Sequence, residues 1–394
     1  MSNLSAGRRA GTAAAAVVTW PVWSGSAPAL TDFFSPRPES GYGLDAEQGY
    51  RPDGDRPPLT VLAGPGGYGK SYLAAAMLRG AARSGRSDLQ VWVNASSPSA
   101  TVMSYARAAA DISLTERGVL PDAAAARFLD WLGRTDRQWM IVLDNVTDSG
   151  GLRGLWPAGP SGQVVVTCHQ SADMSEVAGA DPKVCRIGEF SPREALGYLT
   201  ARLYEEAGKR VEAVDLAADL GYMPLALALA ATTIAGTALD CRQYRIRFAG
   251  RRQELLGRSA DGLVSPAEVA WSLALDRADQ LRPAGLARPL LALVALLDPA
   301  GVPVQVAASR AACAYLSRHG RGMPVDQNEV MAALGNLVTS GLATADRSVG
   351  DGLVAVHPVI QDTVRRLVPA AVLDDAARSA ADAIAEAWPQ LGAD

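Results

Sequence analysis

The sequence is poor in cysteine and histidine. Its four cysteines, at positions 168, 185, 241 and 313, lie far apart with no C-x-x-C pair, and the 394 residues include only three histidines. Zinc sites and disulfide frameworks need closely spaced sets of these residues, so the sequence indicates neither. We expect the cysteines to be free and mostly buried thiols.

The chain also lacks a long apolar run and a strong charge of either sign. No stretch approaches the ~20 apolar residues of a membrane-spanning helix. Arg8 and Arg9 precede an apolar segment at residues 13–18, but this segment is too short and too weakly hydrophobic for a secretory signal. The net charge of −4 suggests neither nucleic-acid nor membrane-surface binding. We expect a cytoplasmic protein of two or three domains with no membrane partner.

A glycine-rich segment following the apolar run at residues 59–63 predicts a phosphate-binding loop. Four residues fill the G-x-x-x-x-G-K-[S/T] pattern: Gly64, Gly69, Lys70 and Ser71. Gly66 and Gly67 let the backbone turn its N–H groups inward around a polyphosphate. Lys70 is expected to reach the β- and γ-phosphates, Ser71 to hold Mg²⁺, and the positive end of the following helix to attract the anion. The alternative interpretation is a glycine-rich surface turn.

Apolar runs after this loop predict the remaining strands of a parallel sheet, with helical patterns between them at residues 99–110 and 123–132. The runs lie at residues 89–95, 139–146, 163–167 and 184–187. The second run is apolar up to Asp144, which indicates a strand buried on both faces with this carboxylate at its carboxyl edge. We expect Asp144 to reach Mg²⁺ directly or through water. Thr167 and His169 arrive at the same edge, where groups can sense a γ-phosphate.

Beyond residue 190 the pattern becomes almost entirely helical, which predicts a separate helical domain after the sheet. Ser191 followed by a proline is typical of a helix start. Two later helices, expected at residues 211–220 and 226–235, are separated by a turn that Pro224 fixes.

The ordered motifs resemble those of the NB-ARC branch of the STAND NTPases, the signalling ATPases of plant resistance proteins, apoptosome scaffolds and many bacterial regulators. The resemblance runs from about residue 20 to residue 368 and is specific because the motifs occur in this order. The motifs are GPGGYGKS at 64–71, MIVLDN at 140–145, VVVTCHQ at 164–170, GYMPLAL at 221–227 and VHPVIQ at 356–361.

The resemblance implies a bound ADP or ATP with Mg²⁺. It places Pro224 against the adenine, Phe34 and Arg37 at the base and ribose, and His357 at the β-phosphate. From the residues alone, aromatics in a proline-rich stretch more often pin a loop to a core, and a histidine at a helix start is usually a cap. The expected nucleotide contacts are Phe34, Arg37, Gly64, Gly66, Gly67, Tyr68, Gly69, Lys70, Ser71, Tyr72, Thr167, His169, Pro224, Leu225 and His357. The expected catalytic residues are Lys70 and Asp144, and the expected Mg²⁺ ligands are Ser71 and Asp144.

Members of this family close the site with a winged-helix domain, and residues 283–368 can be interpreted in this way. Helices are expected at 287–297, 304–316 and 328–342, and hairpin strands at 343–346 and 353–356. The expected fold class is therefore α/β plus α, with a P-loop parallel-sheet domain followed by a helical domain and a winged-helix domain. The expected boundaries are a flexible N-terminal tail at 1–30, a nucleotide-contacting linker at 31–56, the P-loop domain at 57–190, the helical domain at 191–282, the winged helix at 283–368 and a C-terminal linker helix at 369–394.

The implied function is a signal-transduction switch that ADP holds closed and ATP opens, with protein partners or self-association on activation. Asn145 follows Asp144 where many members have a second acidic residue, and His169 lies near the position where others carry an arginine that reads the γ-phosphate. Because an amide cannot act as a general base and a mostly neutral histidine stabilises charge less well than arginine, we expect slow or absent hydrolysis.

Two other functions stay open. One is a transcription regulator that contacts DNA through the winged helix; however, residues 327–342 contain no lysine or arginine and begin beside Asp326 and Glu329, which makes nucleic acid an unlikely partner. The other is a catalytic P-loop enzyme such as a kinase, for which the sequence offers no separate acid–base constellation.

Overall fold

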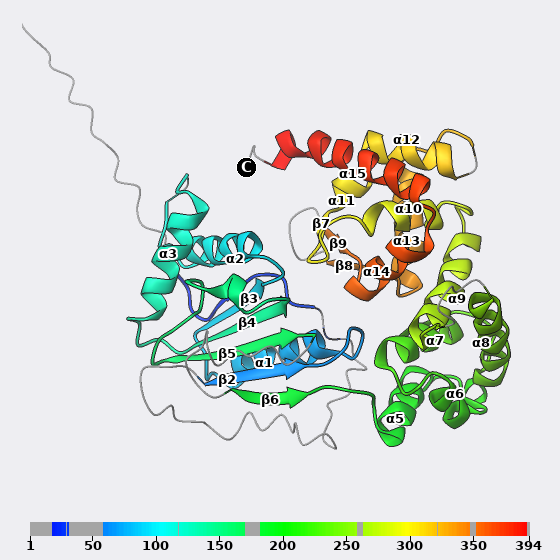
Figure 1. The fold of residues 1–394 in the computed structure, drawn as a ribbon, viewed down its shortest axis with the longest axis horizontal. Coiled ribbons are helices and arrows are strands. Elements are labelled where there is room, and N and C mark those ends of the chain that lie inside the picture. The colour runs from blue at the N-terminus through cyan, green and yellow to red at the C-terminus, as the bar shows by residue number, and fades with distance from the viewer. Residues whose placement is uncertain are drawn as a thin grey trace, which may run out of the picture.

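The structure, a computed structural model, describes residues 18–28, 30, 58–116, 118–169, 182–257, 263–320, 322–346 and 352–391. A six-stranded parallel sheet is followed by a region built mainly from helices, as Figure 1 shows. The predicted fold class, a P-loop-type α/β sheet followed by a helical domain, is confirmed at this level. Among the described residues, no helix is both long and apolar enough to cross a membrane.

The sheet has the strand order β1-β3-β4-β5-β2-β6, and all of its neighbouring strands are parallel. The strands are β1 (Val22–Ser24), β2 (Leu59–Ala63), β3 (Leu89–Asn94), β4 (Trp139–Val146), β5 (Gly162–Cys168) and β6 (Lys183–Arg186). Because β5 lies between β2 and β4, the carboxyl ends of these three strands bring the glycine-rich loop, Thr167 and Asp144 to one edge of the sheet.

Helices cover both faces of the sheet, and the strand sequences alternate accordingly. Helix α1 (Lys70–Arg83) lies on one face, and α2 (Pro98–Asp111) and α3 (Pro121–Leu132) lie on the other. In β4, Ile141 belongs to the core under α2 and α3, whereas Met140 belongs to the core under α1. This explains why the strand reads as a continuous apolar run.

The expectation of a flexible tail at residues 1–30 is wrong for its last part. Val22–Ser24 forms β1 and pairs with β3 at the edge of the sheet. Trp20 stacks on Trp131 of α3 with ring centroids 6.2 Å apart, and the Arg79 guanidinium donates to the Pro28 carbonyl at 2.7 Å. These contacts between distant residues hold a segment that has little strand pattern of its own.

The region after the sheet contains eleven α-helices among its described residues and a small antiparallel sheet of order β7-β9-β8. The first helices are α5 (Pro192–Arg202), α6 (Ala213–Asp219), α7 (Pro224–Ala235), α8 (Cys241–Leu256) and α9 (Pro266–Gln280). Then follow α10 (Ala287–Val294), β7 (Val302–Pro303), α11 (Val304–Ala307), α12 (Arg310–His319), α13 (Gln327–Thr339), β8 (Thr344–Asp346), β9 (Leu353–Ala355), α14 (Pro358–Leu367) and α15 (Ala370–Leu391).

Two details of this region differ from the sequence expectation. The single helix expected at 304–316 is broken into α11 and α12, because the Ser309 hydroxyl accepts from the Ala312 N–H and starts a new helix. The hairpin also gains a third strand, β7, in which Val302 pairs with Val354. A strand of two residues carries no readable pattern.

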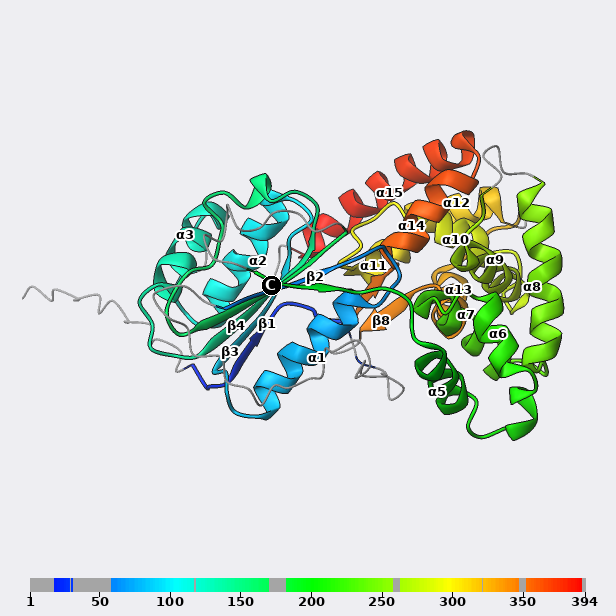
Figure 2. The ribbon, with the colours of Figure 1, turned by 60° about the horizontal axis from the view of Figure 1, so that its bottom comes forward.

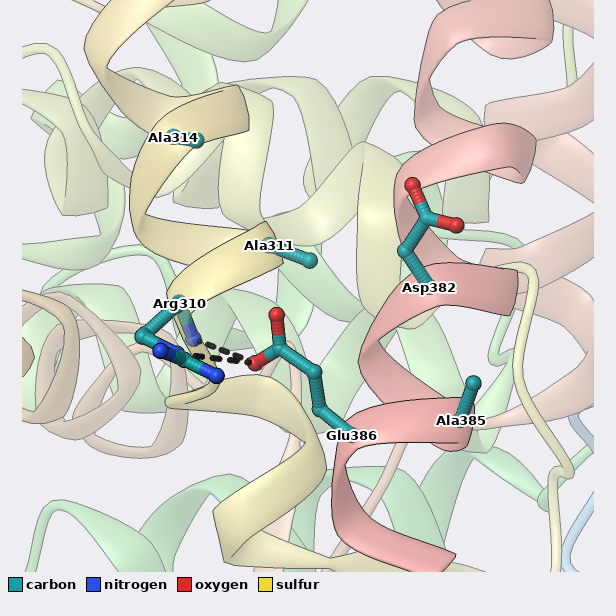
Figure 3. A pocket seen from close by; sticks show the side chains of 6 residues that line it. All are labelled: Arg310, Ala311, Ala314, Asp382, Ala385 and Glu386. Carbon is teal, nitrogen blue, oxygen red and sulfur yellow. Dashed lines mark hydrogen bonds and ion pairs between the residues drawn. The ribbon is translucent and has the colours of Figure 1, made fainter.

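One hydrophobic core joins the whole region after the sheet. It is a single cluster of buried residues that extends from Phe190 to Ala387 and includes side chains from the parts expected as helical domain, winged helix and C-terminal linker helix. Helix α15 packs beside α12, where the Arg310 backbone N–H donates to Glu386 at 2.9 Å (Figure 3). The hollow shown there is lined by residues of α12 and α15 and by none of the expected site residues.

Candidate functional site

The glycine-rich loop joins β2 to α1 in a backbone conformation that glycine accommodates best. Gly64 has φ +155°, and a Cβ atom there would lie 2.1 Å from the Ile187 carbonyl oxygen. Gly67 and Gly69 have φ +82° and +88°, in the left-handed region. Gly69 is also the N-cap of α1 and provides no side-chain cap, so first-turn N–H groups remain for an anionic ligand.

Lys70 is held against this loop. Its Nζ donates to the Gly64 and Pro65 carbonyl oxygens, at 2.7 Å each. Burial lowers the pKa of Lys70, while the nearby carboxylate of Asp144 acts to raise it. The ammonium group is thus fixed beside the loop backbone, where it can meet a phosphate oxygen.

Asp144 and Ser71, the two expected Mg²⁺ ligands, are in direct contact. The Ser71 hydroxyl donates to Asp144 Oδ1 at 2.7 Å, and the Thr167 hydroxyl donates to the same oxygen at 2.6 Å. Burial raises the pKa of Asp144, and these two hydrogen bonds oppose the rise. The arrangement gathers a carboxylate and a hydroxyl at the helix start, which together with phosphate and water oxygens suits Mg²⁺. Among the described residues, no three His, Cys, Asp or Glu side chains form an alternative metal cluster.

Thr167, an expected nucleotide contact, forms two hydrogen bonds within the protein. It is buried, and its oxygen accepts from the Asn145 N–H at 2.8 Å while its hydrogen goes to Asp144. Asn145 has φ +63°, and the β4–β5 register shifts there. Both hydrogen-bonding directions of the hydroxyl are therefore used inside the protein. Thr167 thus holds the carboxylate of Asp144 in place, and its contact with a nucleotide stays a prediction.

The start of α7 touches the loop from the helical region. The Leu225 N–H donates to the Gly67 carbonyl at 3.1 Å, and the Met223 Cε lies 2.9 Å from the position of a Cβ on Gly67. Pro224 is the first residue of α7. Tyr68 packs against the core under α1 and also against the core of the helical region. The segment expected to contact adenine therefore lies directly beside the glycine-rich loop.

The start of α14 also touches the glycine-rich loop. His357 caps this helix, because its Nδ1 accepts from the Val359 N–H at 3.1 Å. The Val359 Cγ2 lies 2.6 Å from the position of a Cβ on Gly66. Burial, assisted by the positive charge of Lys70, lowers the pKa of His357 to about 4. The neutral ring with Nδ1 as acceptor carries its hydrogen on Nε2, which makes Nε2 a donor.

His169, at the end of β5, completes the contacts around the loop. Its Cε1 lies 3.2 Å from the position of a Cβ on Gly66. Burial and the charge of Lys70 lower the pKa of His169, whereas the charge of Asp362 acts to raise it. Val359 and Asp362 were not singled out from the sequence. Their only sequence signal is that they follow His357 within two turns of one helix.

The remaining expected contacts are placed as follows. Tyr72, in the first turn of α1, is half-buried, and burial raises its pKa. The pKa of Tyr198 of α5 is raised mainly by burial, and Tyr72 adds to this rise. Tyr72 is therefore close to the helical region. Phe34 and Arg37 lie outside the described residues. Lys70, Pro224 and His357, which are far apart in sequence, gather around one loop, and the carboxyl ends of the strands point toward the helices that bring them (Figures 1 and 2).

Acidification should lower the stability of the nucleotide-free protein through His357. The unfolded imidazole takes up a proton near pH ~6.5, whereas the folded one does so only near pH 4. Between these values the unfolded state binds more protons, so the free energy of unfolding falls as the pH falls. Urea titrations from pH 7 to 4.5 measure this slope. His357→Gln should reduce this slope by up to about 1.4 kcal/mol per pH unit, and an unchanged slope would contradict a neutral His357 ring in the folded protein.

Comparisons with known proteins agree with this architecture. A crystal structure of a Signal Transduction ATPase with Numerous Domains (STAND) protein with a tetratricopeptide repeat sensor, from Pyrococcus horikoshii, superposes with a TM-score of 0.54 and 12% identity. The match covers 89% of this chain and 46% of that one. The chain is similar in fold to a STAND ATPase.

Two curated relatives carry the name "Regulatory protein AfsR". The protein from Streptomyces coelicolor is 29% identical over 202 residues, and that from Streptomyces griseus is 30% identical over 187 residues. The matches cover 49% and 45% of this chain but only 19% and 18% of the relatives, so the chain spans less than a fifth of their length. No protein-family model matches the chain, and membership of the NB-ARC branch stays a prediction. We expected nucleic acid to be an unlikely partner. The similarity to proteins named as regulators does not support this expectation.

Proposed function

We propose that this chain is a nucleotide-dependent regulatory switch that binds ADP or ATP with Mg²⁺ at the glycine-rich loop. One observation carries the proposal: Gly66 and Gly67 of this loop are contacted at once by the end of β5, the start of α7 and the start of α14. A ligand bound at this loop would therefore influence how the helical region is positioned against the sheet.

Each site residue would bind the part of the ligand that suits its chemistry. Lys70 and the first-turn N–H groups of α1 would meet phosphate oxygens, and the His357 Nε2–H would donate to the β-phosphate. Ser71 and Asp144 would hold Mg²⁺, which neutralises phosphate charge when bound. Pro224 and Leu225 would lie against the base. Thr167 keeps the carboxylate of Asp144 in place through its 2.6 Å hydrogen bond.

Switching follows from differential binding. A diphosphate held by both Lys70 and His357 favours the arrangement in which α14 rests on the loop, because His357 is part of that helix start. A triphosphate would bind this arrangement less favourably than a diphosphate does. Exchange of ADP for ATP would therefore shift the population toward an arrangement in which α14 has moved. A difference of about 5.5 kcal/mol reverses a 99:1 population, and smaller differences give graded responses.

Turnover of ATP should be slow or absent in the isolated chain. The Asp144 carboxylate is held by hydrogen bonds from Ser71 and Thr167, and the amide of Asn145 cannot act as a base. A multiple-turnover assay with Mg²⁺ and ATP measures phosphate release. Brisk hydrolysis that Lys70→Ala abolishes would overturn this part of the proposal.

A second candidate function is a regulator that contacts DNA through the part proposed as a winged helix. The order α10, α12, α13 and the β8–β9 hairpin favours it, as do the relatives named as regulatory proteins. Against it, α13 carries no lysine or arginine, whereas DNA-contacting helices need positive charge. A gel shift with random duplex tests this candidate.

The most direct test of the switch is to denature the purified protein and identify what it releases. Released ADP or ATP, present near one equivalent per chain, supports the nucleotide switch. Absence of nucleotide, together with no binding of added ADP by calorimetry, would reject it.

A further inference from the structure

Gly66 occupies a position of the glycine-rich loop at which neither the sequence pattern nor the backbone requires glycine. The pattern G-x-x-x-x-G-K-[S/T] starts at Gly64 and leaves position 66 open. Gly67 and Gly69 have positive φ angles, whereas Gly66 does not, so an alanine at 66 would meet no left-handed backbone strain. The surroundings of Gly66 give a different reason for a glycine there.

The start of α14 fills the space that a side chain at position 66 would need. The Val359 Cγ2 lies 2.6 Å from the position of a Cβ on Gly66. Two carbon atoms pack at about 3.5–4.0 Å, so a methyl group at 66 and the Val359 side chain cannot both keep their places. The His169 Cε1 lies 3.2 Å from the same position and needs to shift only slightly. Val359 is therefore the main obstacle to a side chain at 66.

Neither Val359 nor the loop can easily give way alone. Val359 is β-branched and lies in the first turn of α14, where one χ1 rotamer is strongly preferred. The Gln361 side-chain amide donates to the buried Leu297 carbonyl at 3.0 Å and anchors α14 within the helical region. The loop is held by Lys70, which donates to two of its carbonyl oxygens at 2.7 Å each. A methyl group at 66 would therefore push the helical region, which shares one core, away from the loop.

We propose that Gly66 and Val359 form a steric latch, in which the missing side chain of Gly66 provides the seat for Val359 and so holds α14 on the loop without a ligand. The inference rests on the proposed function and deepens it, because it adds a restraint that comes from packing and not from the nucleotide. Exchange of ADP for ATP would then have to overcome this contact as well as the bond from His357. The absence of a side chain at 66 would serve the docking of α14, whatever contact the Gly66 N–H makes with phosphate.

A backbone N–H beside the loop reports on this docking. Leu225 is the second residue of α7, so its N–H has no acceptor within the helix, and it donates to the Gly67 carbonyl at 3.1 Å. Because α7 and α14 share one hydrophobic core, a displacement of α14 would also loosen this hydrogen bond. Amide hydrogen exchange of the Leu225 N–H therefore measures how often the helical region leaves the loop.

The experiment follows hydrogen exchange by mass spectrometry in a peptide that contains Leu225, in the full chain without nucleotide. Because overpacking a fixed contact is destabilising, Gly66→Ala should accelerate this exchange roughly 5- to 100-fold. The double variant Gly66→Ala/Val359→Ala removes the obstacle and should bring exchange back to within about threefold of the wild type. Gly80→Ala is the matched control, because Gly80 lies in α1 and a Cβ there meets no atom within 4 Å. It should exchange like the wild type.

A second variant enlarges the same contact from the other side. Val359→Phe changes α14 and leaves the loop sequence intact, so it should also accelerate exchange, and it replaces Gly66→Ala if circular dichroism shows that variant to be unfolded. Wild-type exchange in a folded Gly66→Ala or Val359→Phe protein would overturn the inference. An acceleration in Gly66→Ala that Val359→Ala does not reverse would overturn it too, because the glycine would then serve only the loop.

Calorimetry with ADP and ATP on the wild-type chain tests the proposed function separately. If neither nucleotide binds, the nucleotide switch is rejected even when exchange follows the expected pattern. If ADP binds but exchange does not respond to Gly66→Ala, the switch stands and the steric latch is rejected.

Discussion

Lys70→Ala should weaken ADP and ATP binding by about 100-fold or more. The Lys70 ammonium group is the cation that the structure fixes at the loop, with 2.7 Å hydrogen bonds to two loop carbonyls. In the complex it would exchange these for charge-assisted bonds to phosphate oxygens. Hydrogen bonds to charged groups contribute about 1.5–3 kcal/mol each, and two of them correspond to a hundredfold or more in Kd. Calorimetry with ADP and Mg²⁺ measures the loss.

The control for this variant is Lys183→Ala, which removes an exposed lysine from β6 and should leave the Kd unchanged. The unfolding midpoint of nucleotide-free Lys70→Ala should stay near that of the wild type, because burial already disfavours the charged form of Lys70 in the folded protein. Retention of wild-type affinity in a folded Lys70→Ala protein would remove the loop as the binding site.

Replacing His357 should accelerate ADP release by about 10- to 100-fold. His357 caps helix α14, which is not part of the sheet, so a bond from its Nε2–H to a β-phosphate would link the two parts of the molecule. One such bond to a charged group contributes about 1.5–3 kcal/mol, which appears mainly in the dissociation rate. Stopped-flow displacement of a fluorescent ADP analogue measures this rate.

Two variants of His357 separate binding from helix capping. His357→Ala removes both the Nε2–H donor and the cap of α14, whereas His357→Asn keeps a capping oxygen but is too short to reach the ligand. Both should release ADP faster. His319→Ala, which removes a hydrogen bond between His319 of α12 and Asp375 of α15, serves as the control and should leave release unchanged. A His357→Asn protein with wild-type release would assign the histidine only to the helix cap.

Local patterns were sufficient for much of the fold. Strand β4 has the predicted bounds because every residue before Asp144 is apolar and both faces of the strand are covered. Helix α5 begins where Ser191 and Glu194 form a capping box, which is a signal carried by four consecutive residues. The glycine-rich loop was recognisable because its positive φ angles restrict the sequence at fixed spacing.

Features that depend on contacts between distant residues could not be predicted in the same way. Strand β1 is held by Trp131 and Arg79, more than fifty residues away in the chain. The hydrogen bond from the Asn145 N–H to Thr167 depends on the bulge in β4, and the contact of Val359 with Gly66 depends on how α14 docks. No periodicity within one segment encodes these relations. The motif at residues 356–361 predicted a role for His357 alone, although Val359 in the same motif contacts Gly66 of the loop.

The continuous core of the region after the sheet has a mechanical consequence. Along the part of the chain that the structure describes, the passage from the sheet to the helices follows β6. The Ile187 N–H donates to the Ala63 carbonyl at 2.7 Å on one side of it, and the Phe190 N–H donates to the Tyr222 carbonyl at 3.0 Å on the other. Only Gly188 and Glu189 lie between these anchors. Because helices α5 to α15 share this core, a ligand that displaced α14 from the loop would move the whole region relative to the sheet.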